Sequence, residues 1–155
     1  MTETETETQT PPRPDAAGQG LVSVLGADHL NLRTADLDRA LAFYTGRLGM
    51  QEVRRSTRGD GSVSLVALRA GNAVVFLQPA PDYRPPGDDR ASGLDHYSLE
   101  IEATDPAALA ARLRAAGVEV LEGPVKRWGA HGDGTSVYVR DPDGHHLELK
   151  QYNLG

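Results

Sequence analysis

One sequence pattern occurs twice in this chain, and it constrains the fold more than any other feature. The matching positions lie 67 residues apart: Asp28-His29 and Asp95-His96, Leu32 and Leu99, and Glu52-Val53 and Glu119-Val120. A repeat at a fixed spacing indicates two copies of one supersecondary unit. We therefore expect the second half of the chain to fold as the first half does.

Each copy has the pattern of a strand, a helix and three further strands. In the first copy, residues 28–33 alternate between polar and apolar side chains, and Asp36 offers an N-cap for a helix that ends at Gly49. Strands are predicted at about 50–56, 62–69 and 73–78 in the first copy, and at 118–122, 135–140 and 145–151 after a second helix that ends at Gly117. The predicted fold class is α+β, with two tandem βαβββ modules that form an open, cleft-bearing β-barrel.

The domain organisation follows from these modules. Residues 1–20 alternate Thr and Glu and then become rich in Pro, which predicts a disordered leader. Residues 21–155 are expected to form a single domain. Module one covers about 25–78, module two covers about 94–152, and a linker at 79–93 contains four prolines.

Composition excludes several kinds of partner. A net charge of −6 and a pI near 5.3 argue against nucleic acid and anionic membranes, which require basic patches. The sequence has no apolar run of about 18 residues and no signal-peptide pattern, so we expect a cytoplasmic protein. Because the chain has no cysteine, any metal would be held by His and carboxylate side chains.

A polar face on the last predicted hairpin carries the candidate site. Asp141-Pro142-Asp143-Gly144 reads as its turn, and strand alternation puts Tyr138 and Glu148 on the face opposite the valines and leucines. The repeat makes His29 equivalent to His96, and aligning the two last hairpins makes Phe76 the counterpart of Glu148. We expect these five residues to line one concave face.

Other polar residues are weaker candidates. His131 lies in a Gly-rich stretch, where a solvated imidazole and a catalytic one are both compatible with the sequence. Arg33, Arg140 and Lys150 could bind an anionic substrate, but a solvated rim is the simpler interpretation.

Residues 25–152 resemble the vicinal oxygen chelate superfamily, which includes glyoxalases, fosfomycin- and bleomycin-resistance proteins and extradiol dioxygenases. The stretches that carry the resemblance are Asp28-His29, AFYTGRLGM, Asp95-His96 and YVRDPDGHHLEL. The resemblance implies a mononuclear divalent metal held by His29, His96 and Glu148, with His131 and Tyr138 as catalytic groups beside it. Fe(II) is the favoured metal, and Mn, Ni, Co and Zn also suit two imidazoles and a carboxylate.

The implied activity is that of a metal-dependent enzyme acting on a small substrate that chelates through oxygens. The segment from His131 to Glu148 is similar to the extradiol ring-cleavage signature, so dioxygenation is favoured, although Gln78 stands where such enzymes carry another histidine. The alternatives are a glyoxalase-like lyase or isomerase, for which Phe76 replaces a glutamate ligand, a fosfomycin-type thiol transferase, and a metal-free binding protein of the bleomycin-resistance type. Relatives of this size imply a homodimer in which His29 and the His96/Glu148 pair come from different chains.

Overall fold

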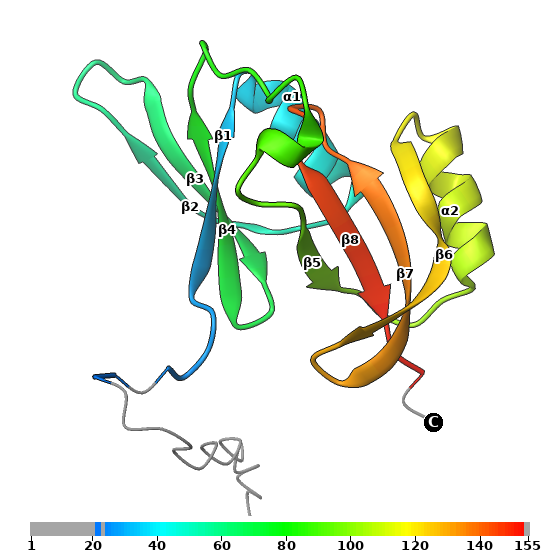
Figure 1. Ribbon diagram of the computed structural model, residues 1–155. Coiled ribbons are helices and arrows are strands. Elements are labelled where there is room, and N and C mark those ends of the chain that lie inside the picture. The colour runs from blue at the N-terminus through cyan, green and yellow to red at the C-terminus, as the bar shows by residue number, and fades with distance from the viewer. Residues whose placement is uncertain (1–20, 23, 154–155) are drawn as a thin grey trace, which may run out of the picture.

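The computed structural model describes residues 21, 22 and 24–153 of the chain (Figure 1). The predicted leader at 1–20 lies outside the described residues. Module one contains β1 (His29–Thr34), α1 (Leu37–Leu41), η1 (Ala42–Arg47), β2 (Glu52–Thr57), β3 (Val63–Ala70) and β4 (Ala73–Pro79). After the short helix η2 (Asp89–Ala91), module two contains β5 (Tyr97–Glu100), α2 (Pro106–Ala115), β6 (Glu119–Gly129), β7 (Gly132–Arg140) and β8 (His146–Gln151).

The strands form two mixed sheets with the same topology. The strand order is β1-β4-β3-β2 in one sheet and β5-β8-β7-β6 in the other. In each sheet the first strand of the module pairs in parallel with the last, and the remaining neighbours are antiparallel. This confirms the predicted α+β fold of two βαβββ modules.

The register of the two parallel pairs reproduces the sequence repeat. Asn31 of β1 is opposite Phe76 of β4, and Ser98 of β5 is opposite Glu148 of β8. Asn31 and Ser98 are themselves separated by the repeat spacing. Phe76 is therefore the structural counterpart of Glu148, as the hairpin alignment predicts.

The first helix begins where the sequence predicts, but its winding changes along its length. The side chain of Asp36 caps α1 by accepting from the amide of Arg39, and Asp105 caps α2 in the same way. The predicted single helix up to Gly49 is instead an α-helical turn followed by the π-helical segment η1. The apolar spacing alone does not distinguish the two windings, because core residues four apart, such as Tyr44 and Leu48, also suit an α-helix.

One hydrophobic cluster joins the two modules. It combines helix residues such as Tyr44 and Leu113 with strand residues such as Leu77 and Val139. Because neighbouring strand residues point to opposite faces, the residues that alternate with this core carry the polar face of each sheet. The apolar faces of both sheets are thus used inside one chain.

The turn after β7 connects the modules through hydrogen bonds. The Tyr44 hydroxyl donates to Oδ2 of Asp141 at 2.6 Å and lies 2.7 Å from the Tyr97 hydroxyl. Oδ1 of Asp143 accepts from the amide of Ala35 at 2.8 Å. Burial raises the pKa of Asp141 above its ordinary value, and burial likewise raises the pKa of Tyr44.

The hairpin of β6 and β7 is longer than the sequence predicts. Its ladder continues to the pair Gly129 and Gly132, although strands were expected only at 118–122 and 135–140. Register shifts between Val120 and Val125 accommodate the proline at 124, which cannot donate to the ladder. His131 therefore lies in a short connection at the end of a long hairpin.

In the described part of the chain, no helix is long and apolar enough to cross a membrane.

Candidate metal centre

Two predicted ligands meet on the polar face of the second sheet. His96 directly precedes β5, and Glu148 is in the middle of β8. The parallel pairing of Ser98 with Glu148 brings the two side chains together, so that Nε2 of His96 lies 3.1 Å from Oε2 of Glu148. An imidazole and a carboxylate, residues of the kinds that bind divalent metals, thus face each other.

The other polar atom of each side chain is already engaged. Nδ1 of His96 lies 2.6 Å from Oδ1 of Asp95, and Oε1 of Glu148 accepts from the Ser136 hydroxyl at 2.5 Å. A carboxylate behind a histidine fixes the tautomer and the ring orientation in metal sites. Nε2 of His96 and Oε2 of Glu148 thus face each other within hydrogen-bond distance, and both atoms are of kinds that bind a metal ion.

The electrostatics favour the charged form of Glu148. Burial acts to raise its pKa, but the hydrogen bond from Ser136 and the positive charge of Lys150 oppose this, and the pKa of Glu148 lies below its ordinary value. The hydrogen bond with His96 likewise lowers the pKa of Asp95. Glu148 is thus held as a carboxylate although only 6% of the residue is exposed.

Tyr138 lies beside this pair, as the sequence predicts. It is opposite Glu148 in the β7–β8 ladder, and its ring stands perpendicular to that of His96 with 5.4 Å between the ring centres. Burial, followed by the charge of Glu148, raises the pKa of Tyr138. The phenol therefore stays protonated near neutral pH and can donate a hydrogen bond to a molecule bound at the pair.

His29 has the same immediate surroundings as His96 but lies apart from the pair. Its Nδ1 lies 2.5 Å from Oδ1 of Asp28, and its ring lies against Phe76 with 4.7 Å between the ring centres. The side chain is 47% exposed. Within residues 24–153, no group of three His, Asp or Glu side chains could hold a metal ion. One chain thus brings together two of the three predicted ligands.

His131 is also separate from the pair. Its Nε2 lies 3.4 Å from Oε2 of Glu100, and its ring lies edge-on to Tyr152 with 5.2 Å between the ring centres. None of its contacts with described residues involves His96 or Glu148. A catalytic role for His131 remains a prediction.

The expectation that Lys150 lies on a solvated rim is wrong. The residue is 4% exposed, and its ammonium donates to the carbonyl oxygen of Arg127 at 2.7 Å. It also lies 3.3 Å from Oγ of Ser136 and 3.4 Å from Oε1 of Glu148. Strand alternation signals this cluster, because Lys150 is two residues from Glu148 and Ser136 is opposite Lys150, but alternation does not reveal the depth of burial.

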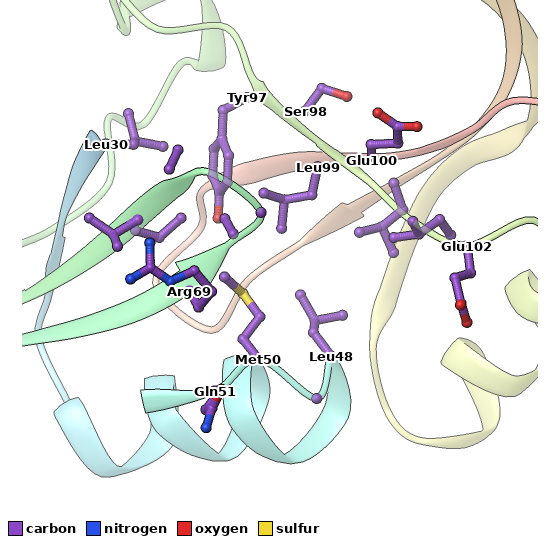
Figure 2. Close-up of a pocket in the computed structure, with 18 of the residues that line it drawn as sticks. Leu30, Leu48, Met50, Gln51, Arg69, Tyr97, Ser98, Leu99, Glu100 and Glu102 are labelled. Carbon is purple, nitrogen blue, oxygen red and sulfur yellow. The ribbon is translucent and has the colours of Figure 1, made fainter. Parts of the chain in front are cut away.

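A large cavity lies on the other face of β5. It has a volume of about 1030 Å³ and lies between the modules, with Leu30, Leu48 and Met50 in its lining. Figure 2 shows the side chains of Tyr97 and Leu99 pointing into this cavity, whereas Ser98 and Glu100 point away from it. Since Ser98 shares its face with Glu148, the cavity and the His96/Glu148 pair are separated by the strand.

Together, the paired βαβββ modules define a glyoxalase-like fold. The chain belongs to the Glyoxalase/Bleomycin resistance protein/Dioxygenase superfamily, whose family model matches residues 26–149.

Individual relatives agree with this family. The chain is 36% identical over 141 residues to the glyoxalase domain-containing protein RDO1 of Mycosarcoma maydis, covering 86% of this chain and 72% of the relative. It is 31% identical over 125 residues to a lactoylglutathione lyase of Salmonella typhimurium, covering 78% of this chain and 88% of that enzyme.

Solved structures share the fold. The integron cassette protein VCH_CASS1 of V. cholerae superposes with a TM-score of 0.61 at 31% identity, covering 86% of this chain and all of that chain. FosX, a fosfomycin resistance protein of Listeria monocytogenes solved with Mn(II) and sulfate, superposes with a TM-score of 0.59 at 21% identity, covering 84% of this chain and 95% of that chain. At 21% identity, the likeness to FosX shows the shared fold alone.

Proposed function

We propose that this protein is a divalent-metal-dependent enzyme that acts on a small substrate chelating the metal through two oxygens. The observation that carries the proposal is the approach of Nε2 of His96 to Oε2 of Glu148. Asp95 holds the other ring nitrogen of His96, and Ser136 holds the other carboxylate oxygen of Glu148. Such preparation of both donor atoms is typical of metal ligands. A bound metal would act as a Lewis acid on the substrate oxygens.

In this proposal the third ligand is His29 of a second copy, so the site is shared across a homodimer. The side chains of His29 and His96 are 47% and 33% exposed in one chain, so a second chain can reach both, whereas Glu148 is buried. Each chain would contribute His29 to one site and His96 with Glu148 to the other, so a symmetric dimer would contain two complete sites.

The donor set of two imidazoles and one carboxylate suits Fe(II), Mn, Co, Ni and Zn. Phe76, the counterpart of Glu148 in module one, packs against His29 and offers no donor atom for a metal. The protein would therefore supply three ligands and leave coordination positions for the substrate.

For the reaction, a lyase or isomerase that moves a proton on the chelated substrate is our first choice. The 31% identity to a lactoylglutathione lyase supports this class. Extradiol-type dioxygenation is the second choice. The position of Tyr138 against His96 supports it, whereas the contacts of His131 with Glu100 and Tyr152 give it no support.

A panel of assays on metal-reconstituted protein separates these classes. The panel comprises thiol hemithioacetals, catechols under oxygen with the Fe(II) form, and fosfomycin with a thiol. Turnover of a hemithioacetal that disappears in the Glu148→Gln variant would support the lyase class. Consumption of catechol and oxygen would instead support the dioxygenase, and product formation from fosfomycin would support the thiol transferase.

The rival reading is a metal-free binding protein. A ligand that binds the metal-free wild type and the Glu148→Gln variant equally tightly, with no turnover in the panel, would favour that reading and contradict the enzyme proposal.

A further inference from the structure

Lys150 is a buried cation beside a residue that we propose as a metal ligand. Its position on β8 puts its side chain on the same face as Glu148, and the β7 strand covers it through Ser136. The ammonium makes its shortest contact with the carbonyl oxygen of Arg127 and also approaches Oε1 of Glu148. Oε2, the carboxylate oxygen that faces His96, is the one that would bind the proposed metal.

Arg127 of β6 is another cation near this face. Its guanidinium carbon lies 5.9 Å from the centre of the Tyr138 ring, and its Nη2 is 2.8 Å from Glu122. The nearby acidic groups therefore already have partners. Glu122 pairs with Arg127, and Asp95 pairs with Nδ1 of His96. The side chain of Asp95 is 92% exposed, so solvent screens its charge, whereas Lys150 and Glu148 are both buried.

The charge balance at the site follows from these contacts. Two neutral imidazoles and one carboxylate would leave a divalent metal with one net positive charge. The buried ammonium of Lys150 compensates the charge of Glu148, so the centre as a whole retains two positive charges. A ligand with two negative charges would then neutralise the centre.

We propose that Lys150 sets the substrate class of the site, by selecting small dianionic ligands that chelate through two oxygens. This inference rests on the proposed metal site and adds a charge requirement to it. Lys150 acts here as a positioning and specificity residue: it holds Oε1 of Glu148 and raises the positive potential where the ligand binds.

A structural role alone predicts a different outcome. If Lys150 only ties β8 to the carbonyl of Arg127, its removal disturbs Glu148 and weakens metal and ligand binding together. The charge role predicts opposite signs, because removing a cation strengthens binding of a metal cation and weakens binding of an anion.

The test uses the full chain and the variant Lys150→Met, which removes the charge and keeps an unbranched apolar stem. Lys150→Gln serves as a second variant, and Ser136→Ala is a matched control that removes a contact to the same Oε1 without changing the charge. Circular dichroism and melting temperature verify folding. Calorimetry measures the affinity for Mn(II), and then the affinities of the Mn-loaded proteins for oxalate and for oxamate, which has nearly the same shape and one charge fewer.

The expected result for Lys150→Met is Mn(II) binding about tenfold tighter and oxalate binding about tenfold weaker than in the wild type. Oxamate binding should weaken by about threefold, since the Coulomb energy scales with the ligand charge. Ser136→Ala should change the affinities for oxalate and oxamate by the same factor.

Two results would overturn the inference alone: unchanged oxalate affinity in both Lys150 variants, or equal weakening of oxalate and oxamate together with weaker Mn(II) binding. If the wild type binds Mn(II) no better than His96→Ala does, the proposed metal site itself is wrong and the inference falls with it.

Discussion

Nε2 of His96 and Oε2 of Glu148 lie 3.1 Å apart, although the two residues are 52 positions apart in the chain. The parallel pairing of β5 with β8 produces this approach, and the equivalent pairing of β1 with β4 places His29 against Phe76 instead. The repeat thus yields two half-sites with different chemistry. One carries a carboxylate and the other an apolar ring.

Replacing Glu148 by Gln should lower the affinity for Mn(II) by at least about 100-fold, because neighbours of a metal ligand already contribute 10- to 100-fold. Glutamine keeps the size and the hydrogen bond from Ser136 but removes the charge. Titration calorimetry measures the change. Glu100→Gln, on β5 at the ion pair with His131, is the matched control and should bind the metal as the wild type does. Equal affinities for Glu148→Gln and wild type would exclude Glu148 as a ligand.

Tyr138→Phe should keep its metal and lose turnover by about tenfold or more, because the ring remains and only the donated hydrogen bond is lost. Since the pKa of Tyr138 is raised, its hydroxyl stays protonated through neutral pH, and the loss should be the same from about pH 6 to pH 8. Steady-state rates with the substrate identified by the panel provide the measurement. Full activity of the variant would remove Tyr138 from the site.

His131→Ala tests the proton-transfer role predicted from the sequence. The variant should bind metal normally, and loss of a general acid or base should lower turnover by about 10² to 10⁴. Glu100→Gln, which removes the ion-pair partner of His131, is the companion variant. Retention of full activity by His131→Ala across the pH range would show that His131 only closes the β6–β7 hairpin against Tyr152.

Asp141→Asn should change how stability depends on pH. Because burial raises the pKa of Asp141 in the folded chain, the folded state binds more protons than the unfolded state between the ordinary and the raised pKa. The free energy of unfolding of the wild type should therefore fall as pH rises through that window. Asparagine can still accept from the amides of Asp143 and His145.

Urea unfolding at several pH values from about 4 to 7 tests this prediction. The Asn variant should gain stability relative to the wild type as pH rises. A constant difference between the two proteins at every pH would contradict it.

The sequence predicts much of the fold because the repeat fixes both modules at once. It predicts the equivalence of Phe76 and Glu148, since a strand register follows from alternation and the turn position. It does not predict the burial of Lys150, because alternation assigns a face and not the depth at which neighbouring strands cover it. The sequence also does not predict the π-helical winding of η1, because its apolar spacing suits an α-helix as well.

The separation of His29 from its predicted partners also lies beyond the sequence. The repeat makes His29 and His96 equivalent, but equivalence does not say whether the two polar faces meet within one chain or between two chains. In the described residues the shared core takes the apolar faces of both sheets and leaves the two histidines apart.

In the proposed metal site, His29 comes from one chain and His96 with Glu148 from another, and a mixing experiment tests this sharing directly. A homodimer of the His29→Ala variant has no complete site, and neither has a homodimer of the His96→Ala variant. When the two variants are unfolded together and refolded as a mixture, half of the dimers are heterodimers, and each heterodimer regains one intact site. We expect the mixture to recover about one quarter of the wild-type Mn(II) content. Metal content no higher than that of the separate variants would contradict a shared site.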